Sequence, residues 1–238
     1  MALDRYVRAG SHEINDGRSM NTAIAIFVKT PTHSPVKTRL AAGIGTEKAG
    51  WFYGLCLKAV RETVRNLDAV LFWAVAEETE LNHPLWQDFA RLYTGTGGLG
   101  ERQYKIYDTL LSVFDRVLLI GADTPQLSST LLEKAILMLE SNDFVVGPAR
   151  DGGYYLFGGR VALEKGIWTS VPWSMNMTRA RLEAVLPAAP VHLAQLTDAD
   201  TADDLSHVAG EMPSDPTDSQ RRVIKWIQKN EYSVPVHG

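Results

Sequence analysis

Short runs of apolar residues separated by polar turns are the clearest pattern in this chain, and they predict alternating strands and helices. Runs with little or no polar alternation suit strands that are buried on both faces of a sheet. Such runs occupy residues 23–28, 69–76, 117–120 and 143–147. Further strands are expected at residues 91–93, from Tyr154 onward, and at 191–196.

Apolar residues at helical spacing fill the segments between these runs. The first stripe lies between the first two strands and consists of Phe52, Leu55, Cys56, Ala59 and Val60. A strand, a helix and a strand in succession form a right-handed crossover, which joins parallel strands and fixes the class as α/β. Further helices are expected after residues 99–102, at 130–139, shortly after Ser174, at 205–212 and at 217–229.

The chain has 238 residues and is 45% apolar, which suits one large domain with a sizeable core. Residues 1–19 are polar and without period, so we expect a disordered extension or residues added in cloning. The main domain is then expected at residues 20–212. Residues 213–238 are expected to form a linker and a C-terminal helix.

Composition narrows the function classes. A net charge of −4 argues against nucleic-acid binding, although a local basic cluster can still bind a small anion. The single cysteine, Cys56, lies on an apolar stripe, so we expect a buried thiol in a reducing compartment and no Cys-based zinc site. No apolar run approaches the roughly 20 residues that span a bilayer. We therefore expect a cytoplasmic protein without a membrane span.

Asp123 follows the strand at residues 117–120, within the sequence GADTP at 121–125. Because Pro125 cannot continue a hydrogen-bonded ladder, Asp123 is expected at the carboxyl edge of the sheet, where open α/β folds bind their ligands. Aspartate is also a common turn residue. The strand end therefore leaves two roles open, ligand binding or a local cap.

A basic segment follows the first strand. Lys29, Lys37 and Arg39 lie within eleven residues, among several hydroxyl side chains. Cations and free backbone amides at a strand end suit a diphosphate or triphosphate, and Lys37 and Arg39 are both expected to be exposed. The glycine spacing matches neither the P-loop nor the dinucleotide fingerprint. A solvated surface loop is the competing interpretation.

Two glycine-rich segments indicate close approach of the backbone to another group. Four glycines fall within residues 95–100, and Asp151-Gly152-Gly153 precedes the aromatic strand that begins at Tyr154. Asp-Gly is also the commonest signal of a hairpin turn, so a purely structural turn remains the alternative at Asp151.

A second acidic strand end occurs at residues 197–205. Asp203 and Asp204 fall in the first turn of a predicted helix, where negative charge favours the helix dipole, so they need no catalytic role. Asp198 and Asp200 precede that turn and are free to point elsewhere.

These motifs together resemble a known family, and they occur in that family's order. They are residues 27–29 (FVK) with 36–40 (VKTRL), 99–102 (LGER), 121–125 (GADTP), 147–155 (GPARDGGYY), 173–174 (WS) and 198–201 (DADT). The chain resembles bacterial nucleotide-diphospho-sugar transferase-like proteins of glycosyltransferase-A (GT-A) fold, related to phospholactate and molybdenum-cofactor guanylyltransferases. The resemblance covers about residues 22–208. It implies a single Rossmann-like domain with a mostly parallel mixed sheet and helices on both faces.

The resemblance also implies roles for individual residues. Mg²⁺ or Mn²⁺ would be held by Asp123 together with Asp200, or with Asp198 as the second choice, and Asp123 and Asp151 are the catalytic candidates. Nucleotide phosphates would be bound by Lys29, Lys37, Arg39, Gly100 and Arg102. The sugar or acceptor would contact Asp151, Gly152, Gly153, Tyr154 and Trp173. The family usually has aspartate and methionine where this chain has Gly98 and Gln103, and a glycine around Ser34.

The expected function is a metal-dependent transferase that takes a nucleotide sugar as donor and an unassigned small molecule as acceptor. A hard cation held by one or two carboxylates and by phosphate oxygens would neutralise the leaving diphosphate. Nucleotidyl transfer from a nucleoside triphosphate would use the same groups and is the alternative. A nucleotide- or sugar-binding protein without turnover is the alternative of another class. The sequence assigns no base, acceptor or oligomeric state.

Overall fold

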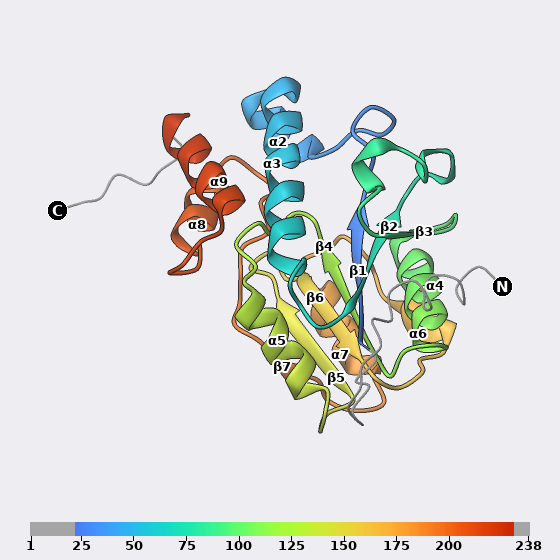
Figure 1. The fold of residues 1–238 in the computed structure, drawn as a ribbon. Coiled ribbons are helices and arrows are strands. Elements are labelled where there is room, and N and C mark those ends of the chain that lie inside the picture. The colour runs from blue at the N-terminus through green and yellow to red at the C-terminus, as the bar shows by residue number, and fades with distance from the viewer. Residues whose placement is uncertain (1–21, 231–238) are drawn as a thin grey trace.

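The computed structural model describes residues 22–230 (Figure 1). The extension expected at residues 1–19 therefore lies outside the described part, as do residues 231–238 of the expected C-terminal segment. Among the helices of the described residues, none has the length and apolar character needed to cross a bilayer.

One seven-stranded sheet forms the centre of the molecule, in the order β3-β2-β1-β4-β6-β5-β7. β6 is antiparallel to both of its neighbours, and every other pairing is parallel. The α/β class and the mostly parallel mixed sheet are thus confirmed. The strands are β1 (Thr22–Val28), β2 (Val70–Val75), β3 (Ala90–Tyr93), β4 (Arg116–Gly121), β5 (Phe144–Pro148), β6 (Tyr154–Gly159) and β7 (Val191–His192).

The last strand is shorter than predicted. β7 ends at His192, whereas the apolar pattern suggested a strand as far as Leu196. Beyond His192 the chain leaves the ladder, and the carbonyl of Ala194 accepts a hydrogen bond from the Tyr155 hydroxyl, at 2.7 Å. It returns to the sheet only through a single bridge between Leu196 and Ala149.

Helices cover both faces of the sheet, as expected. Two short helices, α2 and α6, were not predicted. The helices are α2 (Thr38–Ile44), α3 (Thr46–Val64), α4 (Leu99–Leu111), α5 (Ser129–Met138), α6 (Lys165–Ser170), α7 (Thr178–Val185), α8 (Asp204–Gly210) and α9 (Asp218–Lys229), with 3₁₀ turns η1 (Glu78–Glu80) and η2 (Pro84–Trp86).

The sheet separates two cores because successive side chains of a strand point to opposite faces. On β1, Ile24 and Ile26 face a core that is closed by α3 and α5. Ala23 and Ala25 face a second core that is closed by α4, α6 and α7. This alternation explains why the strand is apolar at every position.

A third core lies outside the first and joins α2, α3, α8 and α9. Cys56 is fully buried in it, which confirms the expected buried thiol. The C-terminal helix packs against α3, where the rings of Phe52 and Trp226 lie 5.1 Å apart. Residues 218–229 are therefore part of the same packed body as the sheet.

Candidate functional site

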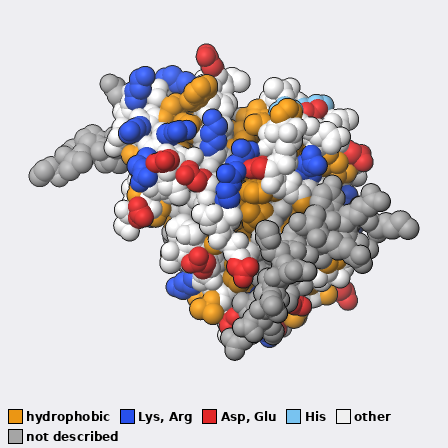
Figure 2. Space-filling model, viewed as in Figure 1, with side chains coloured by type: hydrophobic (Ala, Val, Ile, Leu, Met, Phe, Trp, Pro, Cys, Tyr) orange, Lys and Arg blue, Asp and Glu red, His pale blue; other side chains and the backbone are white. Residues whose placement is uncertain are grey.

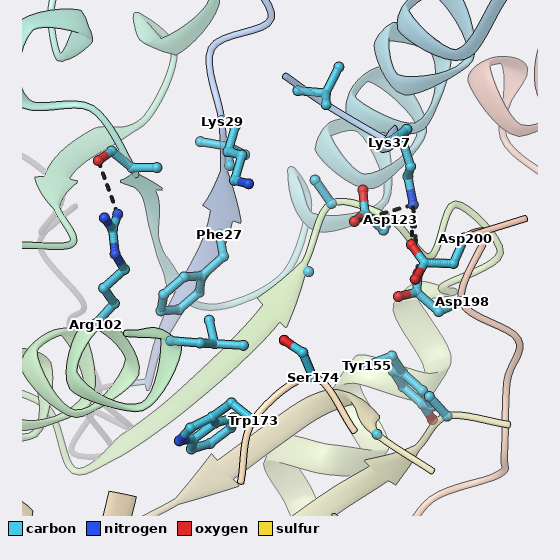
Figure 3. A pocket seen from close by; sticks show the side chains of 18 of the residues that line it. Phe27, Lys29, Lys37, Arg102, Asp123, Tyr155, Trp173, Ser174, Asp198 and Asp200 are labelled. Atoms are coloured by element: carbon cyan, nitrogen blue, oxygen red, sulfur yellow. Dashed lines mark hydrogen bonds and ion pairs between the residues drawn. The ribbon is translucent and has the colours of Figure 1, made fainter. Parts of the chain in front are cut away.

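A cavity of about 1240 Å³ opens at the carboxyl ends of β1 and β4. Figure 3 shows an acidic corner at one end, Arg102 at the other, and aromatic side chains between them. Most residues expected at the site line this cavity: Lys29, Lys37, Arg39, Arg102, Asp123, Asp151, Gly153, Tyr154, Trp173, Asp198 and Asp200. Gly100 and Gly152 are not among its lining residues.

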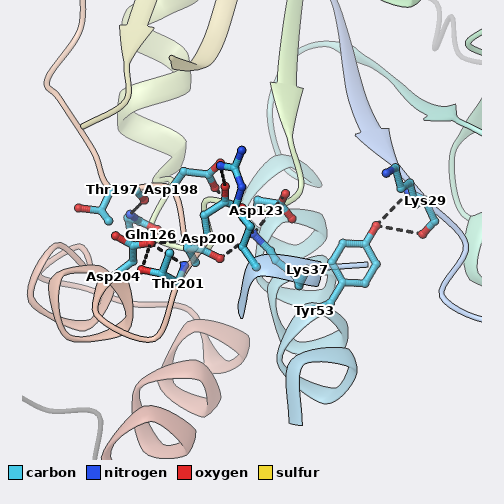
Figure 4. A network of polar contacts seen from close by, with 12 residues as sticks. Lys29, Lys37, Tyr53, Asp123, Gln126, Thr197, Asp198, Asp200, Thr201 and Asp204 are labelled. Atoms are coloured by element: carbon cyan, nitrogen blue, oxygen red, sulfur yellow. Dashed lines mark hydrogen bonds and ion pairs between the residues drawn. The ribbon is translucent and has the colours of Figure 1, made fainter. Parts of the chain in front are cut away.

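The acidic corner forms where a late segment of the chain meets the end of β4. The amide of Ala199 donates to the backbone carbonyl of Asp123, at 3.4 Å, so that Asp198 and Asp200 lie beside Asp123 (Figure 4). Glu211 holds the start of this segment by accepting from the amide and the hydroxyl of Thr197, at 2.7 and 2.8 Å. The two acidic strand ends of the sequence are therefore one site.

Asp204 shapes the turn that carries Asp200. Its carboxylate accepts from the amide of Asp200 at 3.1 Å, and from the amide and the hydroxyl of Thr201 at 2.6 and 2.8 Å. These bonds tie the turn to the start of α8. Asp204 therefore orients the acidic segment without lining the cavity.

Lys37 lies at the centre of the acidic corner. Its ammonium is 3.2 Å from Asp123, 3.8 Å from Asp198 and 4.0 Å from Asp200, and it donates to the carbonyl of Ala199 at 2.8 Å. Only 1% of its side chain is exposed. The expectation of an exposed Lys37 is therefore wrong.

The start of α2 explains the burial of Lys37. Residues 38–40 were expected to continue the loop, but Thr38 begins the helix. Lys37 precedes it with a left-handed φ of 51°, and its side chain reaches the carbonyl of Ala199. Arg39 is 63% exposed, as expected, and its guanidinium lies 2.9 Å from Asp200.

Burial and mutual repulsion set the electrostatics of this corner. Burial raises the pKa of Asp198 to about 7, with Lys37 opposing the shift and with Asp123 and Asp200 adding to it. Burial by itself would lower the pKa of Lys37, but the nearby carboxylates, Asp123 first, raise it. The corner therefore keeps Lys37 charged and disfavours ionisation of Asp198.

The donor set of this corner fits a hard cation that is shared with a ligand. One oxygen of Asp123 and one of Asp198, Oδ1 in each case, are buried without a hydrogen-bond partner. Within residues 22–230, no three carboxylate, imidazole or thiol groups converge closely enough to hold an ion by themselves. Phosphate oxygens would therefore have to complete the coordination.

Arg102 organises the opposite end of the cavity. Its guanidinium donates to the carbonyls of Gly97 and Ala76 at 3.1 and 3.2 Å, and to the Thr94 hydroxyl at 3.1 Å. The Gly98 amide donates to Glu101 at 2.9 Å, which caps α4. Arg102 therefore fixes the glycine-rich loop against the end of β2.

The basic end of β1 has a free cation and an unexpected carboxylate. The side chain of Lys29 is exposed and forms no ion pair within the described part of the chain, while its backbone is held by the Tyr53 hydroxyl. Glu77 accepts from the Thr30 amide at 3.0 Å and keeps Oε1 without a partner. Lys29 is thus available to a ligand.

Asp151 forms the hairpin turn that Asp-Gly predicts, and it also lines the cavity. Its Oδ1 accepts from the Gly153 amide at 2.8 Å, and β5 and β6 pair on either side of the turn. Gly152 has a φ of 88°, and a side chain there would collide with the backbone of Asn176. The hairpin turn is therefore confirmed, and contact of Asp151 with a ligand stays a prediction.

Aromatic side chains form one wall of the cavity. Trp173 stacks on Trp168 with an interplanar angle of 9° and donates from its indole nitrogen to the Trp168 carbonyl at 2.8 Å. Gly100 leaves room for this ring, because a Cβ there would lie 2.2 Å from the indole nitrogen. Tyr154 donates to Gln103, so the departure from methionine at that position provides an acceptor for the hydroxyl.

Some lining residues were missed by sequence reasoning. Glu77 follows β2 directly, so the rule that identified Asp123 could have found it as well. Tyr53 lies on the apolar stripe of α3 and carried no signal. Ser174 belongs to the WS motif at residues 173–174 but was assigned no role, and its left-handed φ of 62° has no signature in the sequence.

Comparisons with known proteins agree with this architecture. A family model described as "Uncharacterized protein conserved in bacteria (DUF2064)" matches residues 57–175. The structure is similar to that of a "putative nucleotide-diphospho-sugar transferase" from Desulfovibrio desulfuricans G20, with 26% identity and a TM-score of 0.76, over 90% of this chain and 98% of that chain. The expected fold is thereby confirmed. No curated protein matches the chain.

Two further structures are less similar to this one, and only the first has a TM-score above 0.5. One is 4-diphosphocytidyl-2C-methyl-D-erythritol synthase from Anaerococcus prevotii DSM 20548, with 10% identity and a TM-score of 0.52, over 88% of this chain and 96% of that chain. The other is Rv0371c from Mycobacterium tuberculosis H37Rv in complex with manganese, with 13% identity and a TM-score of 0.45, over 87% and 100%.

Proposed function

The chain belongs to the DUF2064 family of bacterial proteins, and from that premise we propose that it is a metal-dependent transferase with a nucleotide sugar as donor. The similarity to the Desulfovibrio "putative nucleotide-diphospho-sugar transferase" supports the choice of donor. One observation carries the proposal. Asp123, Asp198 and Asp200 lie together at one end of a cavity of about 1240 Å³, and one buried oxygen of Asp123 and one of Asp198 accept no hydrogen bond.

Asp123 would hold the cation together with Asp200, or with Asp198 as the second choice, and phosphate oxygens would complete the coordination. Mg²⁺ or Mn²⁺, when bound, would neutralise the diphosphate that leaves the sugar. Lys37 keeps the three carboxylates together before any ligand arrives, because its ammonium lies within 4.0 Å of each. It lowers the charge of the corner and thereby disfavours binding of a free cation without nucleotide.

Arg39 and Lys29 would bind the diphosphate oxygens. Arg39 is exposed beside Asp200, so that one side chain can contact both the metal corner and a phosphate. Lys29 lies at the end of β1 with no ion pair in residues 22–230. Charge-assisted bonds of this kind are about twice as strong as neutral ones.

The aromatic wall would bind the sugar or the acceptor. Trp173 is fixed by its stacking on Trp168, and Tyr154 by its bond to Gln103, so neither ring has to be ordered by the ligand. Asp151 Oδ1 is engaged by the Gly153 amide, which orients the carboxylate. Its Oδ2 is then the atom that would accept the proton of an acceptor hydroxyl.

Ligand-linked stabilisation tests the proposal. Thermal unfolding is followed with UDP, GDP, CDP and ADP sugars and with the four nucleoside triphosphates, each with and without Mn²⁺. We expect a nucleotide sugar to raise the melting temperature most, and only with the metal. A larger shift with a triphosphate would favour nucleotidyl transfer instead. Binding without turnover of any acceptor would favour the binding-protein alternative. No shift with any nucleotide would contradict all three.

A further inference from the structure

A basic surface with one exposed tryptophan lies on α3 and α9. On α3, Lys48, Trp51 and Lys58 are three and seven residues apart and so share one helix face. On α9, Arg222, Lys225 and Lys229 share a face in the same way. We call these six residues the α3–α9 surface. Figure 2 shows Lys and Arg side chains gathered around an apolar patch over these two helices.

The two faces adjoin because α3 and α9 pack side by side in opposite directions. The Ser219 amide, at the start of α9, donates to Glu62 near the end of α3, at 2.8 Å. Further along, Trp226 of α9 packs on Phe52 of α3. The cations of both helices therefore lie along the same seam.

The protein only weakly neutralises the cations of this surface, since Arg222 and Lys225 lie near enough to Asp218 to help lower its pKa. None of the five forms an ion pair within the described residues, whereas Arg61 and Arg221 on the same helices pair with Asp88 and Asp218. The carboxylate of Glu62 is already hydrogen-bonded to α9, which leaves Glu47 as the other acid of α3. A chain with a net charge of −4 thus concentrates unpaired positive charge on one face.

Trp51 is the second unusual feature. It is 68% exposed, the largest fraction among the large apolar side chains of the described part. An exposed indole surrounded by Lys and Arg is the composition of a surface that binds at the lipid headgroup level, where the ring enters the interface and the cations meet anionic lipids.

We propose that the α3–α9 surface binds the surface of an anionic phospholipid bilayer peripherally. Charge complementarity and the exposed indole carry this choice. A nucleic acid is disfavoured as the partner because proteins that bind nucleic acids usually have a basic net charge, whereas this chain has a net charge of −4. The proposal does not depend on the transfer reaction. Tyr53 of α3 lines the cavity two residues from Trp51, so a bound bilayer would lie on the far side of this helix, about 10–12 Å across.

Vesicle cosedimentation of the full chain tests the proposal. We expect binding to phosphatidylcholine vesicles that contain 30% phosphatidylglycerol, weak binding to pure phosphatidylcholine, and loss of binding in 0.5 M NaCl because salt screens the attraction. Arg222→Glu with Lys225→Glu should weaken the apparent affinity at least tenfold, and Trp51→Ser several-fold. Lys134→Glu with Arg181→Glu makes the same charge change on α5 and α7 and should bind as wild type.

Three results would overturn the proposal. The first is equal binding to neutral and anionic vesicles. The second is an equal loss in the control pair and the α9 pair. The third is binding of polyglutamate or DNA as tightly as phosphatidylglycerol vesicles, which would make this a general anion-binding patch. Circular dichroism of each variant establishes that the loss does not come from unfolding.

Discussion

Lys37 holds three carboxylates together at one point of the cavity, so its removal is an informative single substitution. Lys37→Met leaves Asp123 and Asp198, whose side chains are about a third exposed, without their close cation, while Asp200 keeps Arg39, and we expect the free energy of unfolding to fall by about 1–3 kcal/mol. Arg39→Met is the matched control. Its side chain is 63% exposed, so the loss should stay within about 1 kcal/mol. Urea unfolding measures both, and similar losses would contradict the central position of Lys37.

Asp198 should make stability depend on pH. Its pKa rises from the usual 3.8 to about 7 on folding, because burial favours the protonated form. The stabilisation is complete below about pH 4 and is lost as pH rises toward 7. Asp198→Asn removes this loss. The stability of the variant minus that of wild type should therefore be larger at pH 8 than at pH 4.5, by at least about 1 kcal/mol, since one pKa unit corresponds to 1.36 kcal/mol. Thermal unfolding of Asp198→Asn and wild type at the two pH values measures this difference. The same difference at both pH values would contradict the raised pKa of Asp198.

At the residue scale, strand ends were predictable and local conformation was not. Asp123 and Asp198 follow strands or strand-like segments, and that position alone placed them at one edge of the sheet. The burial of Lys37 depends on a contact with Ala199, 162 residues away, and on a left-handed backbone. Neither feature has a signature in the residues around Lys37.

At the scale of elements, the contact between the start of α4 and the aromatic wall gives a test. Gly100→Ala would place a Cβ 2.2 Å from the indole nitrogen of Trp173 and 2.3 Å from the Trp168 carbonyl. We expect a loss of about 1–3 kcal/mol from overpacking, with a displaced Trp173. Denaturant unfolding measures the loss, and near-ultraviolet circular dichroism reports the tryptophan environment.

Gly50→Ala on α3 is the matched control for this substitution. A Cβ at Gly50 has no atom within 4 Å, so alanine should stabilise the helix by about 0.5–1 kcal/mol. If Gly100→Ala were as stable as Gly50→Ala and left the aromatic signal unchanged, the contact with Trp173 would not shape the wall.

Long periodic elements were predictable, and short ones were not. α3 has a full apolar stripe, and β1 and β4 are uninterrupted apolar runs, so each was identified from its period. α2 has seven residues and one fully buried side chain, too few for a period. β7 was overestimated because its apolar residues continue beyond the ladder.

At the scale of the whole molecule, the order of the motifs predicted the fold and the shared site better than any single motif did. Strand ends far apart in the chain line one cavity because the parallel strands share a carboxyl edge. No motif predicted that α9 packs on α3, because the apolar stripe of α9 specifies a buried face but not the helix that covers it. The α3–α9 surface therefore became visible only in the folded molecule.

In the proposed site, Asp123 would hold the cation that accompanies a bound nucleotide. Calorimetric titration of the best-stabilising nucleotide, with and without Mn²⁺, tests it on wild type, Asp123→Asn and Asp203→Asn. Asn preserves the size of the side chain and removes its charge. Asp203 is the control because it lies in the same acidic segment, is exposed and does not line the cavity. We expect metal-dependent binding to persist in Asp203→Asn and to disappear in a folded Asp123→Asn. Metal-dependent binding of wild-type strength in Asp123→Asn would contradict the claim.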